Sequence, residues 1–268
     1  MLAKLQERYG LTSFTLKVIG IILMVSDHIH QMFAYVGAPE WMTMVGRVVA
    51  PIFLFLAAEG FHYTHSRIGY MRNLLIGFWI TSVMEVILQT QLPNEHVVLM
   101  NAIFGTLFLG VMVMWIWDGL KHPIANKKAF AWSMLGIIYL IGSTALMAVM
   151  LSFAATGNVL PMRIYMVAVP NLMNIEGGVV FLLLALIFHI FREKRAVALL
   201  LYTAFSLWML FQSAQHGFSD IQWMMIFAVP LLALYNGKQG RKDKWFFYIF
   251  YPSHLAVLYI ISTVFFNK

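Results

Sequence analysis

Apolar stretches long enough to cross a membrane recur from end to end of this chain, and they constrain its fold more than any other feature. A transmembrane α-helix needs about 20 consecutive, mostly apolar residues. Only 11% of the 268 residues are charged, whereas soluble domains average about 25%. The sequence therefore predicts an all-α, polytopic membrane helix bundle that forms a single domain over residues 1–268. We expect about nine transmembrane helices (eight to ten), at residues 14–36, 44–61, 72–91, 97–118, 129–153, 174–191, 196–215, 219–236 and 246–265.

The distribution of lysine and arginine predicts the orientation of this bundle. Basic residues precede the first expected span and follow the second, fourth, sixth and eighth spans, and the other loops contain few of them. Because cytoplasmic loops carry an excess of Lys and Arg, the N-terminus is expected in the cytoplasm and the C-terminus outside. The net charge of +7 then reflects topology rather than nucleic-acid binding. The segment 154–173, with two prolines, stays open as a loop, an interfacial piece or a re-entrant segment.

The chain contains no cysteine, which excludes several kinds of site. Disulfides, thiolate metal sites and an acyl-cysteine intermediate are all ruled out. His62 and His65 lack an obvious set of further ligands, so no metal is expected. The first apolar run is longer than the core of a signal peptide and lacks a small-residue cleavage site, so no cleavable signal is expected.

A few ionisable side chains interrupt the apolar stretches, and these are the candidates for function. Such residues are costly in hydrocarbon and normally face the bundle interior. In LMVSDHIHQMF, Asp27, His28 and His30 fall near the middle of the first span, and His254 falls near the middle of the last. Both helices are expected to run outward, so His28 and His254 would meet if these helices are neighbours. A lone histidine is often an interhelical hydrogen-bond partner, but a mid-depth Asp needs a partner or a hydrated cavity.

Three further charged residues lie closer to the ends of the expected spans. Arg47 lies near the outer end of the second span, where it would bind a ligand or extend to the interface. Glu59 lies near the inner end of the same span, and either a structural or a binding role is open for it. Glu85, in the third span, is interpreted as structural.

Five motifs, in order, resemble those of the TraX family. They are LKVIGIILMVSDHI, GRVVAPIFLFLAAEGFHYT, YMRNLL, NAIFGTLFLG and FFYIFYPSHL. The resemblance covers both ends of the chain and roughly the first 110 residues, whereas about 120–240 match only in hydrophobic pattern.

The resemblance implies a CoA-dependent N- or O-acetyltransferase, multi-pass in the bacterial cytoplasmic (inner) membrane. The family is named for an acetyltransferase of conjugative pilus systems that acts on the N-terminus of pilin, and it is similar to the acyltransferase family 3 superfamily. The expected partners are acetyl-CoA, or another acyl-CoA, on the cytoplasmic side and a protein, peptide or glycan acceptor on the outer side. Neither the acceptor nor the acyl chain length follows from the sequence.

Acyl transfer needs a base and a group that stabilises an oxyanion, and the polar residues can be assigned to these roles. His28 is the expected general base, because the pKa of histidine lies near neutrality. Asp27 would position His28 or hold the acceptor, and His254 would act as a relay or oxyanion donor. The expected acceptor-side residues are Arg47, Glu59, Tyr251 and Asn101. The expected residues for the CoA phosphates are Arg67 and Arg72.

Two other functions stay open at this point. A small proton-coupled transporter would use Asp27, His28 and Glu59 as a proton path. Paired broken helices in two halves, which favour such a transporter, are not evident in the sequence. The third possibility is a structural membrane component of a pilus or secretion system.

Overall fold

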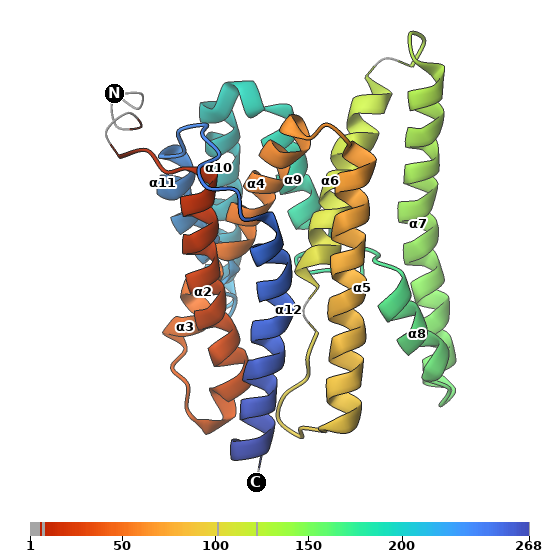
Figure 1. The fold of residues 1–268 in the computed structure, drawn as a ribbon, viewed down its shortest axis with the longest axis vertical. Coiled ribbons are helices and arrows are strands. Elements are labelled where there is room, and N and C mark those ends of the chain that lie inside the picture. The colour runs from red at the N-terminus through yellow and green to blue at the C-terminus, as the bar shows by residue number, and fades with distance from the viewer. Residues whose placement is uncertain (1–5, 7–8, 101, 122, 268) are drawn as a thin grey trace. The chain divides into compact units, whose positions relative to one another are not determined.

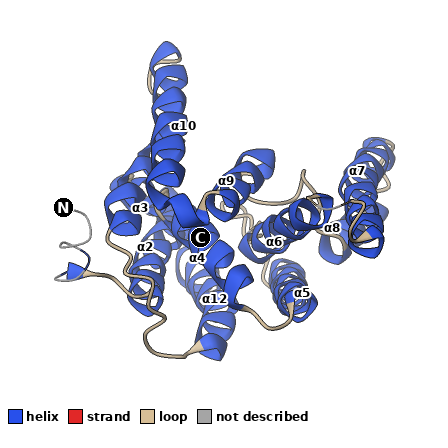
Figure 2. Cartoon of the chain, turned by 90° about the horizontal axis from the view of Figure 1, so that it is seen from above, coloured by secondary structure: helices blue, strands red, loops and turns tan. Residues whose placement is uncertain are grey.

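The computed structural model describes residues 6, 9–100, 102–121 and 123–267, and this part of the chain consists of helices and loops (Figures 1 and 2). In it, seven helices are long and apolar enough to cross a membrane: Ser13–Val36, Trp41–Tyr63, Arg67–Gln91, Ile103–Leu120, Lys127–Ala155, Arg192–Gln215 and Trp245–Phe266. Two shorter apolar helices, Gly178–Ile190 and Gln222–Ala233, complete the order of the nine predicted segments. The predicted polytopic all-helical bundle is therefore confirmed.

The helices follow the predicted spans with local differences. Their bounds are α2 (Ser13–Phe33), η1 (Ala34–Val36), α3 (Trp41–Gly46), α4 (Val49–Tyr63), α5 (Arg67–Gln91), α6 (Ile103–Leu120), α7 (Lys127–Ala155), α8 (Leu160–Ala168), α9 (Gly178–Ile190), η2 (Arg192–Lys194), α10 (Arg195–Gln215), η3 (Gln222–Phe227), α11 (Ala228–Ala233), α12 (Lys244–Ile261) and η4 (Ser262–Phe266). The open segment 154–173 contains the end of α7 and the nine-residue helix α8, which has a proline in its first turn and ends before Pro170. Thr12 and Asn126 cap α2 and α7, because their side-chain oxygens accept the N–H groups of Thr15 and Ala129.

The predicted fourth span begins later than expected, at Ile103. Val97 and Leu99 are buried, whereas Val98 and Met100 are 63% exposed, which is the two-residue alternation of extended chain. The Gln89 side chain completes the hydrogen bonds of this segment, because its amide nitrogen donates to Leu99 O (3.2 Å) and its oxygen accepts from Leu99 N (3.1 Å). Apolar composition alone could not distinguish this paired, extended chain from a helix.

Two predicted spans are shorter in the structure than in the sequence interpretation. Helix α9 has 13 residues, so it is about 20 Å long, whereas the hydrocarbon core is about 30 Å thick. The residues before it form a polar loop in which Asn171 and Asn174 bond backbone groups. Similarly, Gln222–Ala233 follows a loop in which Gly217 and Phe218 have positive φ. In both places the helix begins later than predicted, because the preceding loop has local side-chain hydrogen bonds or positive φ angles.

Contacts group the chain into two compact units, which are described separately. Unit 1 contains Met1–Leu56, Glu85–Leu99 and Ile190–Lys268, and unit 2 contains Ala57–Met84 and Met100–His189. Helices α4 and α5 continue from one unit into the other, so the division does not fall at one point in the sequence. The expectation of a single domain stays a prediction.

In unit 1, α2 and α12 lie side by side and run in the same direction (Figure 1). Near their C-terminal ends, Ser262 Oγ donates to Met32 O (2.7 Å) and bonds the Tyr35 hydroxyl (3.0 Å). At the other end, Ser13 N donates to Lys238 O (2.9 Å) and Arg195 Nη1 donates to Tyr235 O (2.5 Å). The loops predicted to be cytoplasmic in this unit therefore gather at one end.

In unit 2, close contacts at glycine hold the long helices together. A Cβ on Gly119 of α6 would lie 2.0 Å from Ser133 Oγ of α7, and one on Gly77 of α5 would lie 2.9 Å from the Phe104 ring. The start of α6 is tied to the loop before α9, because Ala102 N donates to Glu176 Oε1 (2.9 Å). These contacts bring the ends of α6 and α9 into a fixed position.

Candidate functional site

The two histidines that the sequence placed at similar depth are in direct contact in unit 1. Nδ1 of His28 on α2 lies 2.6 Å from Nε2 of His254 on α12. Their rings are stacked, with centroids 4.9 Å apart and planes 22° apart. His28 is only 6% exposed. The first and last long helices are therefore joined by an imidazole pair.

A third contact fixes which nitrogens of this pair carry protons. Nδ1 of His254 lies 2.9 Å from Phe250 O, and a carbonyl only accepts, so Nδ1 of His254 is the protonated nitrogen. Nε2 of neutral His254 is then an acceptor, so His28 donates from its Nδ1. The lone pair of neutral His28 is consequently on Nε2. Two successive hydrogen bonds, from His254 to the Phe250 carbonyl and from His28 to His254, thus select the His28 tautomer in which Nε2 is the basic nitrogen.

Aromatic rings of α12 surround the imidazole pair. Phe250 stacks on His254 with ring centroids 4.9 Å apart. Tyr251, 4% exposed, meets His28 edge-on at 6.0 Å and His254 edge-on at 5.6 Å. Tyr251 was predicted as an acceptor-side residue, and the structure places its ring against both histidines. These ring contacts restrict the motion of the two imidazoles.

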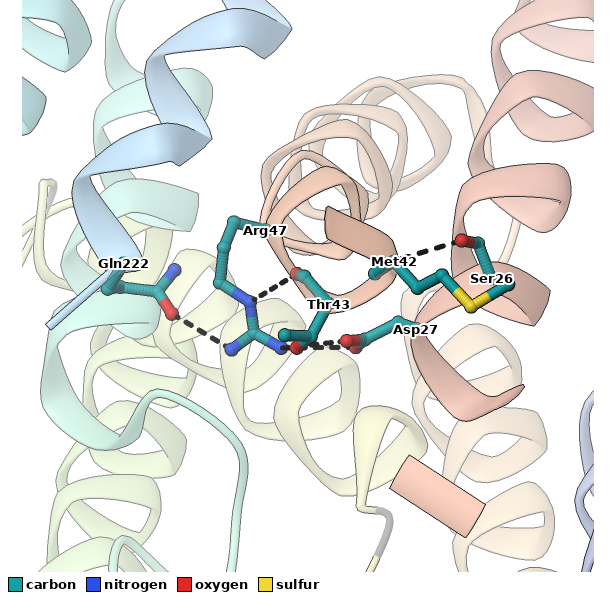
Figure 3. A network of polar contacts seen from close by, with 6 residues as sticks. All are labelled: Ser26, Asp27, Met42, Thr43, Arg47 and Gln222. Carbon is teal, nitrogen blue, oxygen red and sulfur yellow. Dashed lines mark hydrogen bonds and ion pairs between the residues drawn. The ribbon is translucent and has the colours of Figure 1, made fainter. Parts of the chain in front are cut away.

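Asp27, next to His28 in sequence, is bonded to a different partner (Figure 3). Arg47 Nη2 lies 3.1 Å from each oxygen of the Asp27 carboxylate. Arg47 also donates through Nε to Thr43 O (3.2 Å), through Nη2 to Thr43 Oγ1 (3.1 Å) and through Nη1 to Gln222 Oε1 (3.4 Å). Adjacent helical residues point about 100° apart, which is why His28 meets α12 while Asp27 meets Arg47.

Gly46 allows the Asp27 side chain to reach Arg47. A Cβ on Gly46 would lie 2.4 Å from both Cβ and Cγ of Asp27, closer than any ordinary contact. Ser26 Oγ also donates to Met42 O (3.4 Å), so α2 and α3 pack closely here. The Gly-Arg pair near the start of the second span was the available sequence signal, and only Arg47 of the two was recognised.

A second polar cluster, in unit 2, is centred on Asp118, which the sequence interpretation missed. The Asp118 carboxylate is 3.0 Å from Arg67 Nη1, 3.2 Å from Lys121 Nζ and 2.8 Å from His189 Nε2. The Arg67 guanidinium also lies over the Phe61 ring, 4.5 Å from its centroid. Asp118 and Lys121 are three residues apart at the end of α6, and this spacing was the signal that could have revealed the pair.

The other predicted residues are placed as follows. Arg72 is exposed on α5 in unit 2, and Glu59, 5% exposed, is buried on α4 in the same unit. Asn101 lies outside the residues that the structure describes. Within the described ranges, no group of three or more His, Cys, Asp or Glu side chains is arranged to hold a metal ion. The roles of these residues, and the expectation of no metal, stay predictions.

Comparison with known proteins identifies the family. The sequence profile described as TraX protein matches residues 13–262. A curated relative, the probable fimbrial assembly protein FimC, serogroup H1, of Dichelobacter nodosus, is 22% identical over 263 residues, covering 92% of this chain and 94% of the relative. No solved structure matches this chain. The resemblance to the wider acyltransferase family 3 stays a prediction. The profile covers nearly the whole chain, including both histidines of the pair and the Asp27–Arg47 network, and this protein therefore belongs to the TraX family.

Proposed function

We propose that this protein is a membrane acyltransferase that moves an acyl group, expected to be acetyl, from cytoplasmic acyl-CoA to an amine or hydroxyl acceptor at the outer face. The observation that supports this most is the His28–His254 pair with its fixed tautomers. A general base needs a nitrogen that carries a lone pair and a partner that stabilises its protonated form. His28 has the lone pair on Nε2, and His254 accepts the hydrogen bond from Nδ1.

The reaction uses these atoms as follows. The acceptor N–H or O–H transfers its proton to Nε2 of His28 while the acceptor N or O forms a bond to the thioester carbonyl carbon. The bond to sulfur then breaks, and the leaving thiolate takes the proton back from Nε2. During the step, His254 accepts from Nδ1–H of the imidazolium, as an orienting acceptor does in other base-catalysed acyl transfers. The products are the acylated acceptor and free CoA.

The cluster around Asp118 supports a site for the donor. Guanidinium and ammonium groups bind phosphate, and Arg67 and Lys121 are each 45% exposed while Asp118 holds them in place. Both lie beside loops that the charge distribution predicts to be cytoplasmic. We assign the phosphates of acyl-CoA to Arg67 and Lys121, with Arg72 as an outer contact.

The relative supports the biological setting. FimC of Dichelobacter nodosus is named as a probable fimbrial assembly protein, and it aligns over nearly its whole length. We therefore propose that this chain acts in the assembly of a pilus or a similar surface structure, with a membrane-exported subunit as acceptor. A purely structural component of such a system would share this setting but would not consume acyl-CoA.

The test is turnover of labelled acetyl-CoA by the purified protein in proteoliposomes, measured as free CoA and as label in protein. Because general-base catalysis contributes about 10²–10⁴-fold, His28→Ala is expected to lower turnover by at least 100-fold. His65→Ala, which changes an exposed loop histidine, is the matched control and is expected to retain turnover. Full activity of His28→Ala would exclude the base assignment. Absence of acetyl-CoA binding and turnover by the unaltered protein would exclude the acyltransferase.

A further inference from the structure

The Asp27–Arg47 ion pair lies well inside the membrane-spanning region, yet it is partly exposed. Asp27 is nine residues before the end of the span Ser13–Val36, or about 14 Å from that end. Arg47 is six residues after the start of Trp41–Tyr63, or about 9 Å from the same side. Their side chains are 22% and 29% exposed, respectively. A charged pair is not stable against lipid tails at this depth, so this exposure points to water.

The hydrogen bonds of the ion pair occupy the donors of Arg47 more fully than the acceptors of Asp27. All three nitrogens of the Arg47 guanidinium have partners, namely Asp27, Thr43 and Gln222. The Asp27 carboxylate offers about four lone-pair sites, and Nη2 of Arg47 is the donor placed on it in the described structure. Arg47 thus acts mainly as the counter-ion of Asp27, and Asp27 is the group with capacity for a ligand.

We infer that the network of Ser26, Asp27, Thr43, Arg47 and Gln222 lines a hydrated site open to the outer side, and that Asp27 binds a hydrogen-bond donor, N–H or O–H, of the ligand. This rests on the proposed function insofar as the ligand is the acyl acceptor. The group of the acyl acceptor that is recognised is then an N–H or O–H that donates a hydrogen bond to Asp27, and not a carboxylate bound by Arg47. His28 follows Asp27 in the chain, so a donor held there is next to the catalytic helix face.

The chain has no cysteine, which allows a direct test of water access. Ser26→Cys is nearly isosteric, and Gln222→Cys removes only the 3.4 Å contact to Arg47 and a 3.8 Å contact to Met225 Sδ. Each substitution places one thiol in the network. Val257→Cys is the matched control, because Val257 is also nine residues from the outer end of its span and is 54% exposed. Spheroplasts are treated with the membrane-impermeant reagent methanethiosulfonate ethyltrimethylammonium, and labelling is measured by mass spectrometry.

Both network thiols are expected to react, whereas Val257→Cys is expected to stay unlabelled in hydrocarbon. If Ser26→Cys and Gln222→Cys are as unreactive as Val257→Cys, the hydrated site is overturned. This readout does not depend on acyl transfer, so the site can fail while the acyltransferase stands, and the reverse. The isosteric Ser26→Cys keeps the test decisive if Gln222→Cys does not fold.

A second measurement tests which charge faces the ligand. The network thiol is reacted with the cationic reagent and with its anionic sulfonate analogue, and both rates are divided by those of Glu40→Cys in the exposed outer loop. The cationic reagent is expected to react about tenfold faster, the scale at which local charge alters association rates. Asp27→Asn in the same background is expected to remove this preference. A faster anionic reagent, or a preference unaffected by Asp27→Asn, would show that Asp27 is not the recognising group.

Discussion

The two units each contain a polar cluster with an aspartate, an arginine and histidine, but they connect these residues differently. In unit 2, Arg67, Lys121 and His189 all converge on one carboxylate, that of Asp118. In unit 1, Asp27 is taken by Arg47 and His28 is bonded to a second, neutral histidine. In unit 2, the carboxylate of Asp118 is shared by all the basic side chains of the cluster. In unit 1, the ion pair and the imidazole pair are separate.

The two histidines therefore keep their lone pairs on different nitrogens, and the groups that accept from their N–H groups differ. His189 donates from Nε2 to a carboxylate, and its buried Nδ1 has no hydrogen-bond partner in the described structure. His28 donates to His254, and the tautomer chain leaves its Nε2 as the basic nitrogen. An Asp-His neighbourhood is therefore a poor guide to function until the partner of each nitrogen is known.

The largest expected effect comes from breaking the histidine pair. His254→Ala removes the acceptor of His28 Nδ1–H and is expected to lower kcat by about 100-fold or more. The base then loses the contact that fixes its tautomer and stabilises its protonated form. His254→Gln retains a side-chain acceptor and is expected to recover part of the rate. His189→Gln, which can still donate to Asp118, is the comparison in unit 2 and should leave kcat unchanged. Equal losses in His254→Gln and His254→Ala would contradict an orienting role.

The next effect concerns the approach of Asp27 to Arg47. Gly46→Ala is expected to displace the Asp27 side chain, because the new Cβ would overlap it, and to lower turnover by about 10–100-fold through misplacement of the site. Gly142→Ala on α7 is the control, because a Cβ there has nothing within 4 Å. Steady-state rates and thermal unfolding of both variants distinguish a loss of turnover from a loss of stability. Normal turnover in Gly46→Ala would show that the ion pair is dispensable.

A smaller effect is expected from removing the carboxylate of unit 2. Asp118→Ala leaves Arg67 and Lys121 without their shared partner and is expected to lower the free energy of unfolding by about 1–2 kcal/mol, since both cations are half exposed. The KM for acetyl-CoA is expected to rise while kcat stays close to that of the unaltered protein. Thermal unfolding in detergent and initial rates at varied acetyl-CoA provide the two readouts. A fall in kcat at unchanged KM would instead connect Asp118 to the chemical step.

The smallest effect separates two arginines of the predicted donor site. Arg67→Ala removes a guanidinium fixed by Asp118 and Phe61 and is expected to raise the KM for acetyl-CoA by about tenfold, the loss of one good charge-assisted contact. Arg72→Ala changes an exposed side chain and is expected to raise KM by less than about threefold. A competition assay with CoA and with CoA lacking its 3′-phosphate tests which phosphate is involved. An equal increase in both variants would count against a preorganised Arg67.

The length and composition of the apolar stretches predicted the bundle, the order of its nine segments and the similar depth of His28 and His254. These properties depend on local quantities, namely the rise per residue and the cost of exposing polar groups to lipid. The same quantities failed at 97–100, where alternating burial and the Gln89 side chain favour extended chain. They failed again before α9, where the hydrogen bonds of polar side chains hold a loop and the helix begins later than predicted.

The sequence determined which segments are apolar enough to cross the membrane and at what depth their polar residues lie. Both properties follow from the length and composition of each apolar segment by itself. Only the tertiary structure decided which partner each polar side chain takes. Asp27 pairs with Arg47 because Gly46 admits it, and His28 pairs with His254 because α2 and α12 are neighbours. Asp118 became visible only when α5, α6 and α9 brought their ends to one carboxylate. Such contacts join residues that are far apart in the chain, and the local pattern does not encode them.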